Sequence, residues 1–481
     1  MHEFDVVIAN GTLVTADGQT RQDLGIADGR ITAWRLPGEA GEGRVRTIDA
    51  SGKYVVPGGV DPHVHFHGRH RTIFNKDDYD NGSVAAAFGG TTTFLNFVLP
   101  GPGETALEAV ELARARASSR AAIDFGFHVS LPSNGSWTFE TLDELVAAGI
   151  PSFKVFMTYR REGLFVGDGL LVEILERAAG AGALTMVHAE NSDVIEHRTA
   201  AFVDAGQVGP RFHGLSRPPF VEAEAVQRAA FFAERAGAAI YVVHVSSGEA
   251  QREILRARER GVAAYGETCT HYLALTDEVY GRPDALDYIV SPPIRGQGDQ
   301  DALWEALRST GSLCAVGSDD CAYDRTQRRQ FGEAFDQVPN GAAGIEMRLP
   351  VLFGLGVATG RVSLEQMVAI SSTNAARLFG LYPRKGSLEV GADADVVILD
   401  PAADRTITWS ELHMDVDHSM FEGLALRGYP ALTMSRGEVI VDEGRFTGSL
   451  GRGRFLRRSL DRGLLAEPGL APRLSGVPLH G

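Results

Sequence analysis

The feature that most limits the fold of this chain is a regular alternation, starting at Tyr54, of short apolar segments with alanine-rich ones. The alanine-rich segments, such as 107–117, 170–179 and 222–236, indicate helices. The apolar segments indicate eight β-strands, at Tyr54–Val60, Thr91–Val98, Ile123–Ser130, Ser152–Met157, Leu184–Ala189, Ile240–Val245, Ala263–Thr268 and Leu313–Ser318. Eight strands with helical crossovers are what a (β/α)8 barrel requires, so we predict an α/β fold with a TIM-like barrel over residues 54–385.

The two ends of the chain have a different sequence pattern from the middle. Residues 1–53 alternate short apolar runs with dipeptides typical of hairpin turns, such as Asn10-Gly11 and Asp28-Gly29. A similar pattern of strands and turns begins again at Gly386. We therefore predict that residues 1–53 and 386–450 together form a small β-sandwich domain beside the barrel. The basic segment 451–481 is predicted as a C-terminal tail, either an oligomerisation arm that docks on a neighbouring subunit or a frayed end.

Side chains that bind metals lie at the ends of several predicted strands. His63 and His65 follow the first strand two residues apart, so extended backbone points both imidazoles the same way. Lys154 is the only charge in the fourth strand, where an unpaired buried ammonium is costly. The fifth, sixth and eighth strands end with His188, His244 and Asp319. Because barrels carry their active sites at the C-terminal ends of the strands, we predict one shared site, and imidazole ligands suit zinc or another transition metal.

This arrangement resembles the metal-dependent amidohydrolase superfamily. The segments that look like its hydantoinase and dihydropyrimidinase family are Ser152–Tyr159, His188–Asn191, His213–Pro218, Ser291–Arg295 and Pro339–Gly341. The resemblance implies two divalent metal ions, with zinc expected, bridged by Lys154 after its carboxylation by carbon dioxide. Such a carbamate would replace a costly buried cation with an anion between two cations. The implied ligands are His63, His65 and Asp319 for one ion, and His188 and His244 for the other.

The same resemblance implies the substrate contacts and the reaction. Tyr159 would donate a hydrogen bond to the oxyanion, while main-chain groups at Ser291 and Asn340 would pair with a cyclic amide or imide. Asp319 would take a proton from the attacking water and return it to the leaving nitrogen. We therefore expect a hydrolase that opens a 5,6-dihydropyrimidine or hydantoin ring to an N-carbamoyl amino acid.

Two other functions stay open from the sequence. The segment Glu267–Leu273 leans towards allantoinases and dihydroorotases, so an allantoinase or another cyclic ureide hydrolase is an alternative. A dihydroorotase usually carries arginine at the position of His67. A non-catalytic dihydropyrimidinase-like scaffold is the third reading, which the intact ligand set disfavours. The chain departs from the family at Asp320, where relatives usually have histidine, and this residue places a second carboxylate beside Asp319.

Composition bears on partners and location. The chain has 46 basic and 62 acidic residues and a formal charge of −16, which disfavours nucleic acid and anionic membranes as partners. Its N-terminus lacks the pattern of a signal peptide, and its 3 cysteines are too few for a disulfide framework, so we expect a cytoplasmic protein. The family resemblance implies a homo-oligomer, with a tetramer expected.

Overall fold

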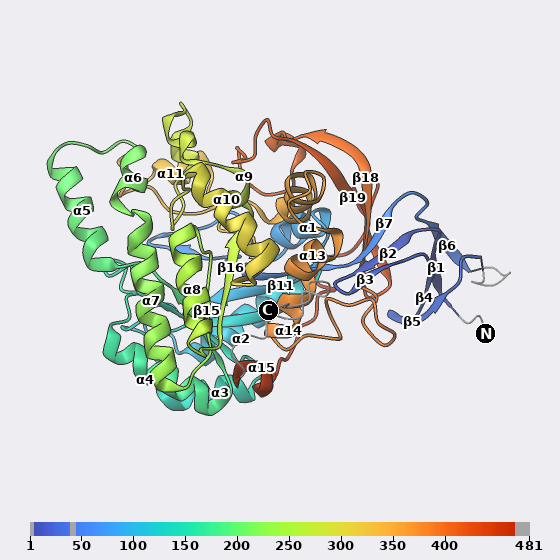
Figure 1. Ribbon diagram of the computed structural model, residues 1–481, viewed down its shortest axis with the longest axis horizontal. Helices are drawn as coiled ribbons and strands as arrows, with labels where there is room; N and C mark the ends of the chain where they lie inside the picture. The colour runs from blue at the N-terminus through green and yellow to red at the C-terminus, as the bar shows by residue number, and fades with distance from the viewer. Residues whose placement is uncertain (1–3, 39–44, 467–481) are drawn as a thin grey trace.

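The larger part of the molecule is a barrel of parallel strands. The structure, a computed structural model, describes residues 4–38 and 45–466, and Figure 1 shows a helix-rich part beside a smaller β-rich part. Neighbouring barrel strands pair in sequence order, from β8 (Gly59–Val64) through β11 (Thr91–Val98), β12 (Asp124–Ser130), β13 (Ser152–Phe156), β14 (Leu184–His188), β15 (Ile240–Val242) and β16 (Ala264–Cys269) to β17 (Leu313–Gly317). The amide of His65 donates to the carbonyl of Asp320 at 2.9 Å, which joins the two end strands. The predicted TIM-like barrel is confirmed.

Helices cover the outside of this barrel (Figure 1). Those between consecutive strands include α1 (Asn81–Phe88), α2 (Ala106–Arg120), α3 (Phe139–Ala147), α4 (Asp168–Ala181), α7 (Pro219–Ala236), α8 (Gly248–Glu259) and α10 (Gln297–Glu305). An excursion between β14 and α7 adds α5 (Ser192–Asp204) and α6 (Arg211–Ser216). Shorter helices are α9 (Thr270–Ala274), α11 (Arg325–Arg329), α12 (Arg348–Val351), α13 (Leu364–Val368), α14 (Asn374–Leu378) and α15 (Arg462–Ala466). Within the described residues, none of these helices combines the length and apolar character needed to cross a membrane.

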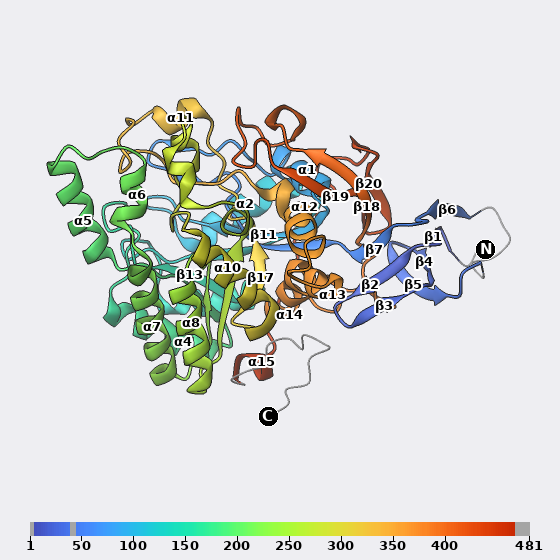
Figure 2. The same cartoon turned by 45° about the horizontal axis from the view of Figure 1, so that its top comes forward.

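The smaller part is a sandwich of two β-sheets to which both ends of the chain contribute, as predicted. One sheet has the order β5 (Arg30–Arg35), β4 (Asp23–Ala27), β1 (Val6–Ala9) and β6 (Arg46–Asp49). The other has the order β21 (Arg445–Phe446), β20 (Glu438–Asp442), β19 (Ala425–Ser435), β18 (Val396–Thr406), β7 (Tyr54–Pro57), β2 (Thr12–Thr15) and β3 (Gly18–Thr20). Figure 2 shows the long strands β18 and β19 reaching from this domain towards α1 and α12 of the barrel.

The predicted first strand, Tyr54–Val60, is two strands in the structure. β7 pairs with β18 in the small domain, and β8 begins the barrel. Gly58 lies between them, and its amide donates to the carbonyl of Asp395 at 2.8 Å. A Cβ atom at Gly58 would collide with the side chain of Thr92, so only glycine fits where the chain passes from one sheet to the other. The apolar run is continuous across this point, which is why periodicity alone did not separate the strands.

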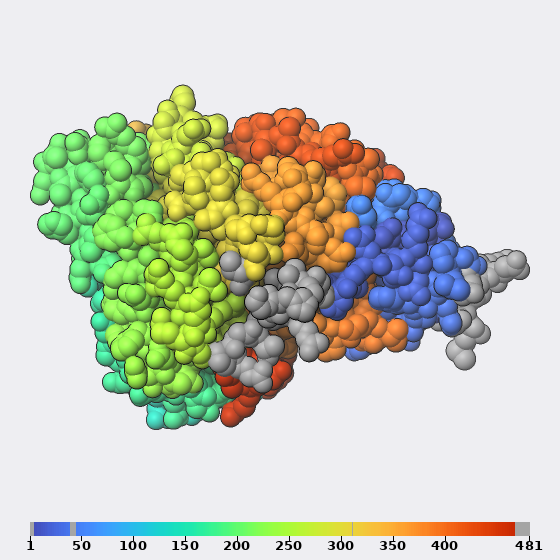
Figure 3. Space-filling model, viewed as in Figure 1, coloured from blue at the N-terminus to red at the C-terminus, as the bar shows by residue number. Residues whose placement is uncertain are grey.

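The first residues of the predicted tail pack against the barrel of the same chain. The amide of Leu456 donates to the carbonyl of Phe125 in β12 at 2.7 Å. The buried guanidinium of Arg458 donates to the hydroxyl of Ser152 at 2.9 Å, where β13 begins. This segment therefore closes the end of the barrel where the strands start, and Figure 3 shows the C-terminal residues in red at that end. The rest of the predicted arm, 467–481, lies outside the described residues.

A buried ion network joins the barrel to the small domain. The ammonium of Lys385 lies 2.7 Å from Asp124, 2.8 Å from Asp395 and 3.1 Å from Asp393. Burial alone would raise the pKa of Asp124, but Lys385 and Arg436 bring it below its usual value. Asp124 is therefore charged at neutral pH, and the three buried carboxylates share the one cation between them.

Replacing Lys385 with methionine is expected to destabilise the protein by about 3–5 kcal/mol at pH 7, because buried carboxylates lose their cation. The loss should shrink as the pH falls, because carboxylates left without a cation bind protons more readily in the folded state than in the unfolded state. Urea denaturation at two pH values measures both effects, with Lys53→Met as the control at a half-buried position. A loss that is the same at both pH values would show that Lys385 acts through packing alone.

Candidate metal centre and active site

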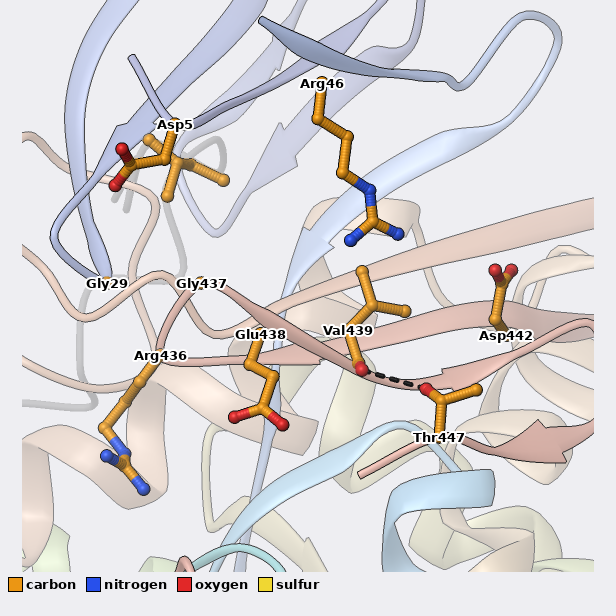
Figure 4. Close-up of a pocket in the computed structure, with 10 residues that line it drawn as sticks. Asp5, Gly29, Arg46, Arg436, Gly437, Glu438, Val439, Asp442 and Thr447 are labelled. Carbon is orange, nitrogen blue, oxygen red and sulfur yellow. Dashed lines mark hydrogen bonds between the residues drawn. The ribbon is translucent and has the colours of Figure 1, made fainter. Parts of the chain in front are cut away.

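Two hollows in the molecule differ in whether the predicted site residues line them. One, of about 500 Å³, lies between the two sheets of the small domain, where Figure 4 shows Arg46 on one side and Glu438 and Asp442 on the other. The hydroxyl of Thr447 there donates to the carbonyl of Val439 at 2.9 Å. The residues that line this hollow carry charges of both signs and include no histidine. The predicted chemistry therefore lies elsewhere.

The second hollow, of about 680 Å³, opens where the barrel strands end. His63 is fully buried beneath it. Its lining contains the other predicted site residues, which are His65, Lys154, Tyr159, His188, His244, Ser291, Asp319 and Asn340. The structure thus brings together all the residues that the sequence placed in the site, from strands and loops spread over most of the barrel.

Three of these side chains converge on one point. The Nε2 atoms of His63 and His65 lie 3.1 and 3.2 Å from Oδ1 of Asp319, and 3.2 Å from each other. A ring nitrogen of His244 also lies within 4.8 Å of a ring nitrogen of His63 and a carboxylate oxygen of Asp319, so these three side chains could hold one ion. Two imidazoles and a carboxylate with their donor atoms turned to a common centre form a donor set that fits a divalent transition metal.

A buried carboxylate fixes the orientation of His63. Glu267 of β16 is hydrogen bonded to Nδ1 of His63, and it also accepts from the hydroxyl of Tyr241 at 2.9 Å. Burial alone would lower the pKa of His63, but Asp319 and Glu267 raise it to about 9. Because Nδ1 is engaged, Nε2 is the atom left for a metal, as in carboxylate–histidine pairs around metal sites. Sequence reasoning missed this role, although an acid inside an apolar strand was the same signal that selected Lys154.

His188 and His244 form the second group. Their rings are 4.3 Å apart between centroids, and Nε2 of His188 lies 2.7 Å from Oε2 of Glu190. Nδ1 of His244 is buried and has no hydrogen-bond partner among the described residues. Burial lowers the pKa of His188 to about 4, so its imidazole is neutral at pH 7. A neutral ring and an orphaned buried nitrogen are both suited to bind a cation.

Lys154 is buried in this pocket without an anionic partner. Its ammonium lies 4.8 Å from the ring centroid of Phe97 and 5.2 Å from that of Phe156. Within the described part of the chain, it forms no ion pair with a carboxylate. Burial lowers the pKa of Lys154 to about 8, although Asp319 and Glu267 oppose the shift.

Tyr159, Ser291 and Asn340 also line the pocket. The ring of Tyr159 packs edge-on against His188 at 5.2 Å, and burial raises the pKa of its hydroxyl, which is therefore protonated at neutral pH. The segments that carry Ser291 and Asn340 are joined by a hydrogen bond from the amide of Gly341 to the carbonyl of Ile289, at 3.1 Å.

Backbone strain concentrates in the same place. Tyr159, His244 and Asp319 have φ angles of 64°, 40° and 50°, and each follows the end of a barrel strand. Such conformations cost about 1–3 kcal/mol each in residues other than glycine and cluster at functional sites. All three side chains line the pocket.

The departure at Asp320 has little effect on the charge of the pocket. This carboxylate is buried and accepts hydrogen bonds from the amides of Gly344 and Ile345, at 2.9 and 3.1 Å. Burial, with the neighbouring charge of Asp77, raises its pKa well above the usual value. The carboxylate of Asp320 therefore lies against the backbone of Gly344 and Ile345, and Asp320 is not among the described residues that line the pocket.

Comparison with known proteins gives a consistent result. Residues 54–440 match the Amidohydrolase family. A D-hydantoinase from Ralstonia pickettii is 44% identical over 458 residues, covering 95% of this chain and 99% of that protein. A D-hydantoinase from Geobacillus stearothermophilus is 42% identical over 465 residues, covering 96% and 98%.

A solved structure agrees with this result. The dihydropyrimidinase from Brevibacillus agri NCHU1002 superposes with a TM-score of 0.91 at 40% identity, covering 95% of this chain and 99% of that one. Fold, site and sequence therefore agree, and this chain belongs to the amidohydrolase family and, within it, to the hydantoinases and dihydropyrimidinases.

Proposed function

We propose that this protein is a metal-dependent hydrolase that opens the ring of a hydantoin or a 5,6-dihydropyrimidine to give an N-carbamoyl amino acid. The observation that carries this proposal is one pocket in which four imidazoles, the carboxylate of Asp319 and the unpaired amine of Lys154 meet. Relatives named D-hydantoinase, at 42–44% identity over nearly the whole chain, support it.

Two divalent ions, with zinc expected, would be held in this pocket. His63, His65 and Asp319 would bind one ion, and His188 and His244 the other. When bound, such ions lower the pKa of water and polarise a carbonyl group. The contacts of His63 with Glu267 and of His188 with Glu190 support metal binding by both rings, because each contact leaves one ring nitrogen free for a metal.

Lys154 would bridge the two ions as a carbamate. In this reaction the neutral amine attacks carbon dioxide, a C–N bond forms and one proton is released. The lowered pKa of Lys154, about 8, supports the step, because a useful fraction of the amine is uncharged near neutral pH. The absence of an anionic partner for Lys154 among the described residues also supports it, since the carbamate would remove the buried positive charge.

The other residues of the pocket would bind substrate and move protons. Main-chain groups at Ser291 and Asn340 would pair with the amide edge of the ring and place its carbonyl carbon near Asp319. Tyr159, protonated because burial raises its pKa, would donate a hydrogen bond to the oxyanion. Asp319 would accept a proton from the attacking water and deliver it to the ring nitrogen as the C–N bond breaks.

The Tyr159→Phe variant is expected to lower kcat by about 100-fold or more with a much smaller change in KM, because an oxyanion donor acts mainly in the transition state. Steady-state kinetics of hydantoin hydrolysis measures both constants. Tyr323→Phe is the matched control, because it removes another hydroxyl from the lining of the same pocket. An unchanged kcat in Tyr159→Phe would show that this phenol has only a structural role.

The proposed function is tested by metal analysis together with a substrate panel. Purified protein should contain about two divalent ions per chain, and chelation should remove both metal and activity. Hydantoin, 5-substituted hydantoins, dihydrouracil and allantoin should be compared, with ring opening expected for the first three classes. Protein with no tightly held metal after expression with zinc, or with no ring opening on this panel, would refute the proposal. Preferred hydrolysis of allantoin would favour the allantoinase reading.

Cytoplasmic location and tetrameric assembly complete the proposal. The three cysteines Cys269, Cys314 and Cys321 are all free thiols, which suits a reducing compartment. The tetramer is what the family resemblance implies. Light scattering should give about four times the chain mass of 51.6 kDa, and a mass of one chain would refute this part of the proposal.

A further inference from the structure

The segment His213–Pro218 has no role in the mechanism so far, yet it places a charged side chain at the pocket wall. It covers the end of α6 and the turn before α7. The guanidinium of Arg217 points from this turn to Oε2 of Glu190 at 2.6 Å and to the hydroxyl of Ser291 at 2.9 Å. Its side chain is only 11% exposed. A mostly buried guanidinium with two such contacts is part of the pocket wall and not a solvated surface charge.

Glu190 links these contacts to the metal centre. The hydroxyl of Ser291 donates to Oε2 of Glu190 at 3.0 Å, and Nε2 of His188 lies 2.7 Å from the same oxygen. One buried carboxylate oxygen therefore meets an imidazole, a hydroxyl and a guanidinium. Without Arg217, this carboxylate would lose its only ion-pair partner of fixed charge among the described residues, and Ser291 would lose a hydrogen-bond donor.

Arg217 also lies beside Tyr159, and its backbone is held in place. Its guanidinium carbon is 5.7 Å from the ring centroid of Tyr159, whose ring packs against His188. The guanidinium of Arg295 donates to the carbonyl of Arg217 and, through Nε, to the hydroxyl of Ser246 at 3.0 Å. Arg217 is thus fixed from behind and contacts the substrate wall in front.

We propose that Arg217 is a positioning residue for substrate: through its contacts with Glu190, Ser291 and the ring of Tyr159, it fixes Ser291 and Tyr159 relative to each other. The proposal rests on the proposed function, because it concerns residues assigned there to substrate binding and oxyanion stabilisation. Arg217 itself would not touch the substrate. Its effect would pass through Ser291 and Tyr159, which makes coupling between these residues the property to measure.

The test begins with Arg217→Ala in the metal-loaded enzyme. We expect kcat to fall about 10- to 100-fold, because a misplaced Tyr159 loses most of the benefit of one oxyanion donor. Guanidinium ions, at concentrations too low to unfold the protein, should restore part of the activity by filling the vacated space. In the Tyr159→Phe background, Arg217→Ala should cost less than about threefold more, because residues that act as a unit are not additive.

Two further variants serve as a control and as a replacement for Arg217→Ala. Arg198→Ala removes a guanidinium that contacts α6 from another side, through the carbonyl of Leu215 at 2.9 Å, and should leave the kinetics unchanged. Arg217→Gln keeps hydrogen-bond donors and is used if Arg217→Ala does not fold. If neither variant folds, Arg217 is structural and the proposal is overturned.

The remaining outcomes separate this proposal from the proposed function. Wild-type protein without ring-opening activity would refute the proposed function itself. Active wild-type protein with an Arg217→Ala variant of unchanged kinetics would refute only the positioning role. Losses that add fully with Tyr159→Phe would also overturn it. So would a loss of metal in parallel with activity, because Arg217 would then act through His188.

Discussion

Replacing Lys154 with alanine is expected to remove metal and turnover together. A carbamate at this position would supply an oxygen to each ion, so the variant lacks one donor from both. The loss in kcat should exceed about 100-fold, which is already the upper range for losing a partner that only orients a metal ligand. Elemental analysis and hydantoin kinetics on the same preparation measure the two effects.

Small carboxylic acids provide the sharpest check on Lys154→Ala. Acetate or propionate can enter the space left by the side chain and supply a bridging carboxylate, so activity should return with acid concentration when zinc is present. Lys53→Ala, at a half-buried position in the small domain, is the control and should respond to neither acid nor zinc. A Lys154→Ala variant that keeps two ions and wild-type turnover without added acid would contradict the bridging role.

The second large effect is expected for Asp319→Asn. The amide keeps the size of the carboxylate but cannot accept the proton of the attacking water, so kcat should fall by about 10²–10⁴-fold. Asp319 is also held between Nε2 of His63 and Nε2 of His65, so some metal should be lost as well. Asp336→Asn is the matched control, because Asp336 lines the same pocket outside this cluster. A loss shared equally by both variants would show that the charge of the pocket matters, and not proton transfer.

Single-turnover kinetics separates the two causes in Asp319→Asn. With metal restored to the wild-type level by excess zinc, a remaining loss in the chemical step belongs to proton transfer. Full recovery on adding zinc would contradict the proposed role of Asp319 as the base.

Much of the fold was predictable because each barrel strand is a short apolar run closed by a turn. The site was predictable for a related reason. A histidine, lysine or aspartate at the end of such a run is costly unless it is paired, so the residue type itself marks the position. Lys154 is the clearest example, since it is the one charge in β13 and forms no ion pair with a carboxylate of residues 4–38 or 45–466.

What escaped prediction depends on contacts between distant segments. Arg217 lies in the segment His213–Pro218, which the family resemblance marked without giving Arg217 a role, and its partner Ser291 is 74 residues away. Gly58 belongs to an uninterrupted apolar run, and only the side chain of Thr92 shows why no other residue fits there. Glu267 stands out in the sequence as an acid inside an apolar strand. Its partner His63 lies 204 residues earlier, so only the fold shows that it orients this histidine.

The pairing of β7 with β18 has a consequence for how the protein is made. Val55 pairs with Ile398, so β7 waits for its partner β18 while roughly 340 further residues are made, or on the order of tens of seconds of translation. During that time β7 has an unpaired edge, which is a template for association with other nascent chains. The sheet that contains β7 is therefore completed only after the barrel strands have been made, and chaperone binding during synthesis should centre on residues 54–57 until residue 399 has emerged.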